Sequence, residues 1–78
     1  MHLTIARVNE NLYNGEAYSV HLPGVGGEFE VLSHHEPLIA TLKAGVVVVR
    51  AEKDSEPERF EIKSGVVEVS DNEALVLL

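Results

Sequence analysis

The residues of this 78-residue chain that could carry out chemistry are concentrated in one stretch, GGEFEVLSHHEPLIATLKAG, residues 26–45. The stretch contains three glutamates, a serine and two adjacent histidines. Ser33 directly precedes His34, but neighbours in sequence rarely have the geometry of a nucleophile and its base, and no strand-to-helix elbow surrounds this serine. The sequence therefore does not predict a serine nucleophile.

The two adjacent histidines raise the question of a metal site. On an extended chain, neighbouring side chains point to opposite faces, so His34 and His35 are poorly placed to chelate one ion. A metal site in a β-structure needs His-x-His or a further ligand from a neighbouring strand, and nothing in the sequence brings His2 or His21 to this position. The chain has no cysteine, which excludes thiolate zinc sites. We expect a loop pair without metal, with one ring buried and hydrogen-bonded and the other exposed.

The glutamates Glu28, Glu30 and Glu36 would act as general acids or bases only inside an apolar cleft that raises their pKa. Glu28 and Glu30 instead alternate with apolar residues, which places them on the outward face of a strand. That face is either solvated or a charged docking surface. No glycine-rich phosphate loop leads into a Lys-Ser or Lys-Thr helix start. We expect no catalytic and no cofactor-binding residue in this chain.

The composition is acidic, with 13 acidic and 6 basic residues and a formal net charge of -7. Such a surface repels phosphates, so nucleic acid and anionic lipid headgroups are not expected as partners. The longest apolar run, Val46–Val49, is far shorter than the roughly 20 residues that span a bilayer. The first residues resemble neither a secretory signal nor a transit peptide. We expect a soluble chain without direct membrane insertion.

Alternation of apolar and polar residues with a period of two predicts strands along nearly the whole chain. We expect Tyr18, Val20 and Leu22 to share one face of a strand. The run from Val46 to Val49 is apolar on both phases, which is typical of a strand buried on both faces. The predicted strand segments are LTI, AYSVHL, EFEVL, GVVVVRAE, RFEIK, VVEV and ALVLL.

Tight turns are predicted between these segments. Asn14-Gly15 is a strong turn dipeptide because both residues tolerate positive φ. Glycine, proline and polar residues mark the other turns. These lie at residues 23–27, 43–45, 63–65 and 70–73, and residues 52–59 read as a solvated hairpin tip.

The segment HHEPLIATL is not expected to form a helix, because it contains Pro37 and the β-branched residues Ile39 and Thr41. No linker or internal repeat divides the chain. The sequence therefore predicts a single all-β domain over residues 1–78. We expect a small flattened β-sandwich or barrel of about eight to ten short, mostly antiparallel strands.

The same stretch also resembles a known family. GEFEVLSHHEPL and LKAG in this chain are similar to a sequence block of that family. The family's block reads Gly-Glu-apolar-Gly-apolar-x-Pro-x-His-x-Pro-Leu, followed by apolar residues and Lys-Pro-Gly. LYNGEAYSVHLPGVGGE and FEIKSGVVEVSDNEALVLL extend the similarity over almost the whole sequence. On this basis the chain resembles the N-terminal β-sandwich domain of the epsilon subunit of F-type ATP synthases. It departs from the family at four positions, Glu30, Ser33, Ala44 and Val66.

The resemblance implies a non-catalytic rotor subunit without cofactors at the foot of the central stalk. Such a subunit links the gamma subunit to the membrane c-ring and couples proton flow to ATP synthesis, at the cytoplasmic face of the inner (plasma) membrane. Carried over residue by residue, it implies a partner interface at Glu28, His35, Pro37 and Leu38. Glu28 would face the c-ring loops and His35 would lie near that face, and an acidic domain suits basic loops.

The family commonly continues into a C-terminal helical hairpin that restrains ATP hydrolysis. This sequence ends at Leu78 with period-two alternation still present at Leu75 and Leu77. We therefore expect a short form that supports coupling without ATP-dependent inhibition.

Two other classes of function remain open. A lipoyl- or biotinyl-type carrier domain is also a small acidic β-sandwich, but it needs a modifiable lysine in a Glu-Thr-Asp-Lys-Ala or Ala-Met-Lys-Met context. Lys43 in LKAG and Lys53 in EKDS have neither context. A small metal-dependent barrel enzyme is the third reading. Intact mass would show the adduct of a carrier, and metal analysis would show the enzyme.

Overall fold

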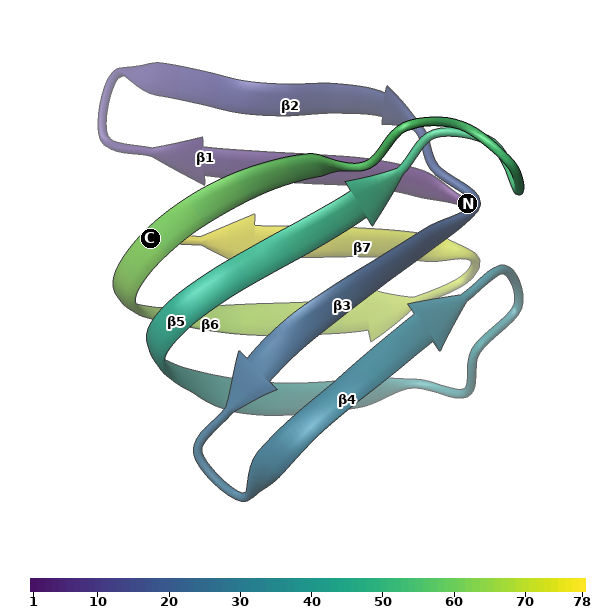
Figure 1. Ribbon diagram of the computed structural model, residues 1–78. Helices are drawn as coiled ribbons and strands as arrows, with labels where there is room; N and C mark the ends of the chain where they lie inside the picture. The colour runs from purple at the N-terminus through teal and green to yellow at the C-terminus, as the bar shows by residue number, and fades with distance from the viewer.

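The computed structural model describes all 78 residues, which form seven β-strands and no helix (Figure 1). The chain thus has no helix that could cross a membrane. All strands join one sheet in the order β2-β1-β7-β6-β5-β3-β4. The strands are β1 (His2–Arg7), β2 (Glu10–Glu16), β3 (Ser19–Gly24), β4 (Gly27–Leu32), β5 (Leu38–Arg50), β6 (Glu58–Ser70) and β7 (Glu73–Leu77).

The pairing is antiparallel throughout except between β1 and β7, which run parallel. This confirms the predicted all-β, mostly antiparallel class, with seven strands instead of eight to ten. The sheet folds over on itself, so that β2, β1 and β7 form one layer and β3 and β4 lie in the other (Figure 1). β5 and β6 take part in both layers.

The predicted turns at residues 43–45 and 63–65 are wrong, because the chain bends there without leaving the strand. β5 and β6 each run for 13 residues. Lys43 pairs with Ser64 and Gly45 pairs with Ile62, so the register is the same on both sides of the bend.

The residues that suggested a turn in each strand mark a change in the alternation of buried and exposed positions. In β5 the buried positions change from even-numbered Leu42 to odd-numbered Val47 and Val49, and in β6 they change from Ile62 to Val67 and Val69. Both strands change phase at facing positions, so the ladder between them is preserved.

Glycines at the bends allow neighbouring strands to come close. A Cβ added at Gly45 would lie 2.8 Å from the Cβ of Pro23, and one added at Gly65 would lie 2.8 Å from the carbonyl oxygen of Leu77. Distances under 3.0 Å are essentially never adopted by real Cβ atoms. These two glycines therefore make the close approach of β3 and β7 to the bends possible.

The turn predicted at Asn14-Gly15 is also wrong. Both residues lie within β2, where Asn14 pairs with Thr4 of β1. The turn between β1 and β2 is formed by Val8 and Asn9, and Asn9 has the left-handed φ of 63°. A turn at residues 14–15 would pair the following strand with β2, whereas that strand pairs with β4 and β5. By contrast, the turn predicted at residues 70–73 is confirmed, since Asp71 and Asn72 have φ of 50° and 59° between the paired Ser70 and Glu73.

The core lies between the two layers. Two expectations about strand faces are wrong. Val46 is 38% exposed although Val47 and Val49 are buried, because only one face of this layer meets the other layer. Tyr18 does not share the buried face of Val20 and Leu22, because it precedes β3, which begins at Ser19. The core residues are Met1, Leu3, Ile5, Ala17, Val20, Leu22, Val31, Leu42, Val47, Val49, Ile62, Val67, Val69, Ala74 and Val76.

Candidate partner interface

Glu28 lies near the start of the edge strand β4, on the outer face of the sandwich. Its neighbours Phe29 and Val31 point inward, which agrees with the outward phase predicted for Glu28 and Glu30. The Nε2 of His21 on β3 donates a hydrogen bond to Oε1 of Glu28, with a distance of 2.6 Å between the two atoms. The Glu28 side chain remains 65% exposed, so the carboxylate is oriented by His21 and still accessible to a partner.

Sequence reasoning missed His21 as part of this site. His21 pairs with Glu30 directly across the β3–β4 ladder, and Glu28 lies two residues from that partner on the same face. Side chains at such diagonal positions are within reach of each other. We call Glu28, Glu30 and His21 the acidic patch. The available signal was the alternation in SVHL, which places His21 outward between Val20 and Leu22.

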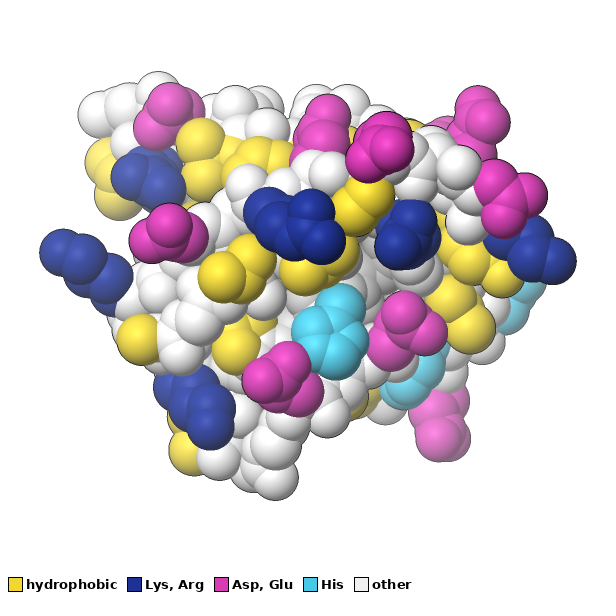
Figure 2. Space-filling view, in the orientation of Figure 1, with side chains coloured by type: hydrophobic (Ala, Val, Ile, Leu, Met, Phe, Trp, Pro, Cys, Tyr) yellow, Lys and Arg dark blue, Asp and Glu magenta, His cyan; other side chains and the backbone are white.

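The acidic patch occupies only part of its face. Histidine and acidic side chains lie side by side over β3 and β4, whereas lysine and arginine side chains lie above them (Figure 2). Arg50 of β5 and Arg59 of β6 are exposed in the same layer. Further acidic side chains lie along the upper edge of the same view, so the negative charge of this face is not confined to the β3–β4 side (Figure 2).

An open hollow of about 520 Å³ lies beside Glu28, between the β3–β4 turn and the first half of β5. Val25, at the tip of the turn, is 61% exposed. An exposed apolar tip next to a carboxylate is suited to contact with a protein surface. The residues that line this hollow are Gly24, Val25, Gly26, Gly27, Glu28, Phe29, Ala40 and Thr41.

His35 lies in the loop between β4 and β5, residues 33–37. Its main-chain N–H donates to the carbonyl oxygen of Leu32 at 3.2 Å, which closes a tight turn. Its Nδ1 donates to the carbonyl oxygen of Glu36 at 2.7 Å. His35 is half-buried and His34 is exposed, so the two rings differ in the expected sense.

The loop is also tied to the N-terminus. The Met1 amino group donates to Oγ of Ser33 at 2.9 Å and to the carbonyl oxygen of Ala17 at 3.2 Å. The Glu16 carboxylate lies 3.4 Å from the same amino group. Ser33 stands where the family that this chain resembles usually has proline, and its hydroxyl contacts the N-terminal amino group.

Pro37 and Leu38 lead from this loop into β5. Pro37 is exposed and Leu38 is half-buried. Both line an open hollow of about 440 Å³, together with Ile39, Glu68, Val69 and Ser70. The structure therefore separates the four predicted interface residues. Glu28 lies near the start of β4, about 13 Å from the end of that strand at roughly 3.3 Å per residue. The other three residues lie beyond that end.

A second surface was not predicted from the sequence. On the outer face of β5, β6 and β7, Ile39 is 73% exposed, Val66 42% and Leu77 51%. Val66 pairs with Leu77, and Glu68 pairs with Ile39 on one side and Leu75 on the other. We call Ile39, Val66, Leu75 and Leu77 the apolar patch. Its sequence signal was the presence of apolar residues on both phases of VVEV and ALVLL.

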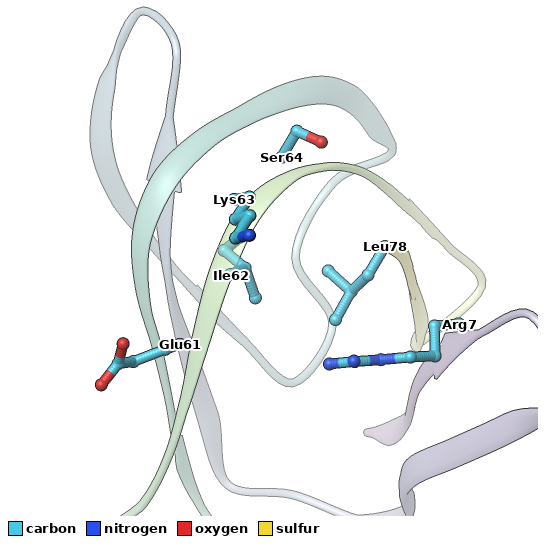
Figure 3. A pocket seen from close by; sticks show the side chains of 6 residues that line it. All are labelled: Arg7, Glu61, Ile62, Lys63, Ser64 and Leu78. Atoms are coloured by element: carbon cyan, nitrogen blue, oxygen red, sulfur yellow. The ribbon is translucent and has the colours of Figure 1, made fainter.

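A third hollow, of about 330 Å³, lies near the bend of β6 and contains none of the predicted site residues (Figure 3). The Arg7 side chain extends beneath Leu78, and Lys63 and Ser64 line the opposite side (Figure 3). The Nε of Arg7 lies 3.7 Å from a carboxylate oxygen of Glu10. The charges in this hollow are mixed, and no nucleophile is paired with a base.

The four histidines lie at three separate positions, since His34 and His35 are adjacent in the β4–β5 loop. His2 is hydrogen-bonded to Asn14 at 2.8 Å, His21 to Glu28, and His35 to the main chain of Glu36. No group of three His, Asp or Glu side chains is arranged to hold a metal ion. The side chains capable of chemistry are thus distributed over the outer faces.

Comparison with known proteins identifies the class. The family model of the ATP synthase delta/epsilon chain β-sandwich domain matches residues 1–78. The chain therefore belongs to this family.

Its relatives are epsilon chains. It is 47% identical over 76 residues to the ATP synthase epsilon chain of Sulfurimonas denitrificans, covering 97% of this chain and 58% of that protein. It is 40% identical to the epsilon chain of Protochlamydia amoebophila, with 96% and 50% covered. For the epsilon chain of Chlorobaculum tepidum the identity is 41%, with 96% and 84% covered. The chain thus spans about half the length of the first two relatives and most of the third.

Solved structures share the fold. A chain in the Euglena gracilis mitochondrial ATP synthase, in an assembly of OSCP, F1 and c-ring, matches with a TM-score of 0.87 at 23% identity, covering 96% of this chain and 48% of that chain. A chain in the central stalk and c-ring of the Tetrahymena thermophila mitochondrial ATP synthase matches with a TM-score of 0.83 at 16% identity, covering 99% and 61%.

Proposed function

We propose that residues 1–78 act as one epsilon-type sandwich domain in the rotor of a proton-translocating F-type ATP synthase. The observation that carries this proposal is the match of the family model to the whole chain. In this role the chain is non-catalytic and belongs to a membrane-associated complex at the cytoplasmic face of the inner (plasma) membrane. It links the gamma subunit to the c-ring, so that rotation driven by protons reaches the catalytic head.

Two distinct surfaces support a link between two partners. The acidic patch is charged and exposed, which suits attraction to basic loops of a c-ring and exclusion of wrong partners. The apolar patch has the composition of a lasting subunit contact, since such interfaces are more apolar than the rest of a protein surface. We therefore assign Glu28 to the c-ring and the apolar patch to gamma. His35 lies beyond the far end of β4, and we assign it to the c-ring side on the basis of the resemblance alone. Pro37 and Leu38 lie beside the apolar patch, in the hollow that also contains Ile39 and Glu68.

The charge of Glu28 is tested by the substitution Glu28→Lys in an enzyme assembled with this chain. Reversal places a like charge against basic loops, so coupling of ATP hydrolysis to proton pumping should weaken. The matched control is Glu56→Lys, which makes the same charge change in the exposed loop between β5 and β6. Circular dichroism of both variants should show the same fold as the parent chain. Unchanged pumping in reconstituted vesicles carrying Glu28→Lys would remove Glu28 from the interface.

The gamma contact is tested by co-purification. Ile39→Asp adds a charge at the most exposed apolar side chain of the patch, beside Glu68, and should reduce the amount of gamma retained by the tagged chain. Val8→Asp is the control, because Val8 is 85% exposed in the β1–β2 turn and is not part of the apolar patch. Equal retention of gamma by the two variants would show that the apolar patch is not the gamma contact.

A further inference from the structure

A side chain from the turn between β6 and β7 holds the loop that carries His35. The main-chain N–H of His34 donates a hydrogen bond to Oδ1 of Asn72, with 2.8 Å between the atoms and 38 residues between them in sequence. We propose that Asn72 is a positioning residue, which fixes the β4–β5 loop and thereby the direction in which His35 meets the partner. The contact of His35 with a partner rests on the proposed function, whereas the hold of Asn72 on the loop does not.

The turn that carries Asn72 is well suited to this role. Asp71 and Asn72 both have left-handed φ and form a two-residue connection between the paired residues Ser70 and Glu73. The carbonyl oxygen of Asn72 accepts a further hydrogen bond from the N–H of His2 at 3.2 Å. The main chain of Asn72 is therefore held by the paired ends of β6 and β7 and by β1, which restricts where its side chain can lie.

The loop needs an external contact of this kind. His34 has a φ of 65°, a conformation that side-chain-bearing residues seldom adopt. Such backbone persists when surrounding contacts determine it. The hydrogen bond to Asn72 holds the N–H of this residue, and the Met1 amine holds Ser33 directly before it. The following residue, His35, then closes its turn onto Leu32.

The held loop defines what His35 offers to a partner. Because a carbonyl oxygen accepts from Nδ1, the proton of the neutral ring is on Nδ1, and Nε2 is left as an acceptor. An acceptor at this position fits a donor on the partner, such as a lysine, an arginine or a free main-chain N–H. This chemistry agrees with the basic loops expected to face the acidic patch.

Three substitutions separate positioning from a general effect on the turn. Asn72→Gly keeps the left-handed backbone but removes the acceptor oxygen, and Asn72→Asp keeps both. Asn9→Gly is the matched control, because Asn9 has the same left-handed conformation, with φ of 63°, in the β1–β2 turn at the opposite end of the sandwich (Figure 1).

The first measurement is amide hydrogen exchange of the 78-residue chain. The amide of His34 should exchange about five- to tenfold faster in Asn72→Gly, as expected for the loss of one hydrogen bond, and should stay protected in Asn72→Asp and Asn9→Gly. The core amide of Val67 serves as the internal reference for global opening. Equal protection of His34 in all four proteins, or a matching loss at Val67, would overturn the proposal.

The second measurement is the affinity of the same proteins for an assembled gamma–c-ring complex. Asn72→Gly should lower the affinity as much as His35→Ala does, and Asn72→Asp should restore it. Faster exchange at His34 with unchanged affinity would show that the loop does not meet the partner and would overturn the positioning role. If the parent chain itself fails to bind, the proposed function is refuted, and the exchange data still decide whether Asn72 holds the loop.

Discussion

Substitution of Gly65 by alanine tests the reason why β6 can bend. The added Cβ would lie 2.8 Å from the carbonyl oxygen of Leu77 and 3.0 Å from Cδ2 of Leu78. Ordinary contacts of a Cβ begin at 3.4 Å, so the Leu77 oxygen would have to retreat by 3.4 − 2.8 = 0.6 Å. Leu77 is paired with Val66 on one side and Ala6 on the other, so its main chain is held from both directions.

The cost of this overlap follows from the fixed position of β7. Inserting a methyl group into a site that cannot move away costs about 1–3 kcal/mol. A domain of 78 residues has a free energy of unfolding of about 4–12 kcal/mol, at roughly 0.05–0.15 kcal/mol per residue. Each kcal/mol lost in a domain of this size lowers Tm by about 4–8 °C. Gly65→Ala should therefore be folded but clearly less stable.

The assay is thermal and urea unfolding followed by circular dichroism, with Gly15→Ala as the control. Gly15 also lies in a strand, but a Cβ added there meets nothing within 4 Å. Its replacement should be neutral or should stabilise by up to about 1 kcal/mol, because alanine restricts the unfolded chain. Equal stability of the two variants would show that the bend does not depend on the absence of a side chain at position 65.

Further predictions concern the core, the ionisation of a tyrosine and the response to salt. Leu42 is fully buried next to the bend, so Leu42→Ala should lower the free energy of unfolding by about 2–5 kcal/mol, measured by urea denaturation; a smaller loss would mean that the site collapses around the alanine. Burial raises the pKa of Tyr13 above its ordinary value of about 10, and the carboxylates of Glu58 and Glu16 raise it further. The unfolded chain thus loses this proton first as pH rises, so the contribution of Tyr13 to stability should be constant below about pH 9 and fall above about pH 10. Tyr13→Phe should reduce that fall in urea titrations. Finally, the affinity for a c-ring should decrease with rising salt if the acidic patch makes the contact, and binding independent of salt would argue against charge attraction.

Local patterns in the sequence were enough to predict the fold class. Val20 with Leu22, Val67 with Val69, and Ala74 with Val76 alternate with outward residues, and all of them are buried. Period-two alternation reports which side of a strand faces the core, because successive side chains point to opposite faces. The outward position of Glu28 was predictable for the same reason.

The family resemblance was also predictable from the sequence, because it rests on residue types in order along the chain. The match of the family model to residues 1–78 confirms it. The roles of Glu28, His35, Pro37 and Leu38 stay predictions, since they depend on partners outside the chain.

The number and length of the strands depended on tertiary structure. The dipeptide Asn14-Gly15 and the segments at residues 43–45 and 63–65 have the local composition of turns, and all three lie within strands. Turn propensity is a local preference of a few residues, whereas the pairing of β1 with β2 and of β5 with β6 involves whole ladders of hydrogen bonds. The sum of many long-range contacts therefore outweighs the local preference.

The contacts that shape the candidate interface were likewise beyond the sequence. His21 meets Glu28 only because β3 and β4 pair in one register, and a shift by one residue would place His21 on the other face. Asn72 reaches His34 only because the folded sheet brings the β6–β7 turn beside the β4–β5 loop. Hydrophobic period fixes the face on which a side chain lies, but the partner of that side chain is set by strand order and register, which arise when the layers pack together.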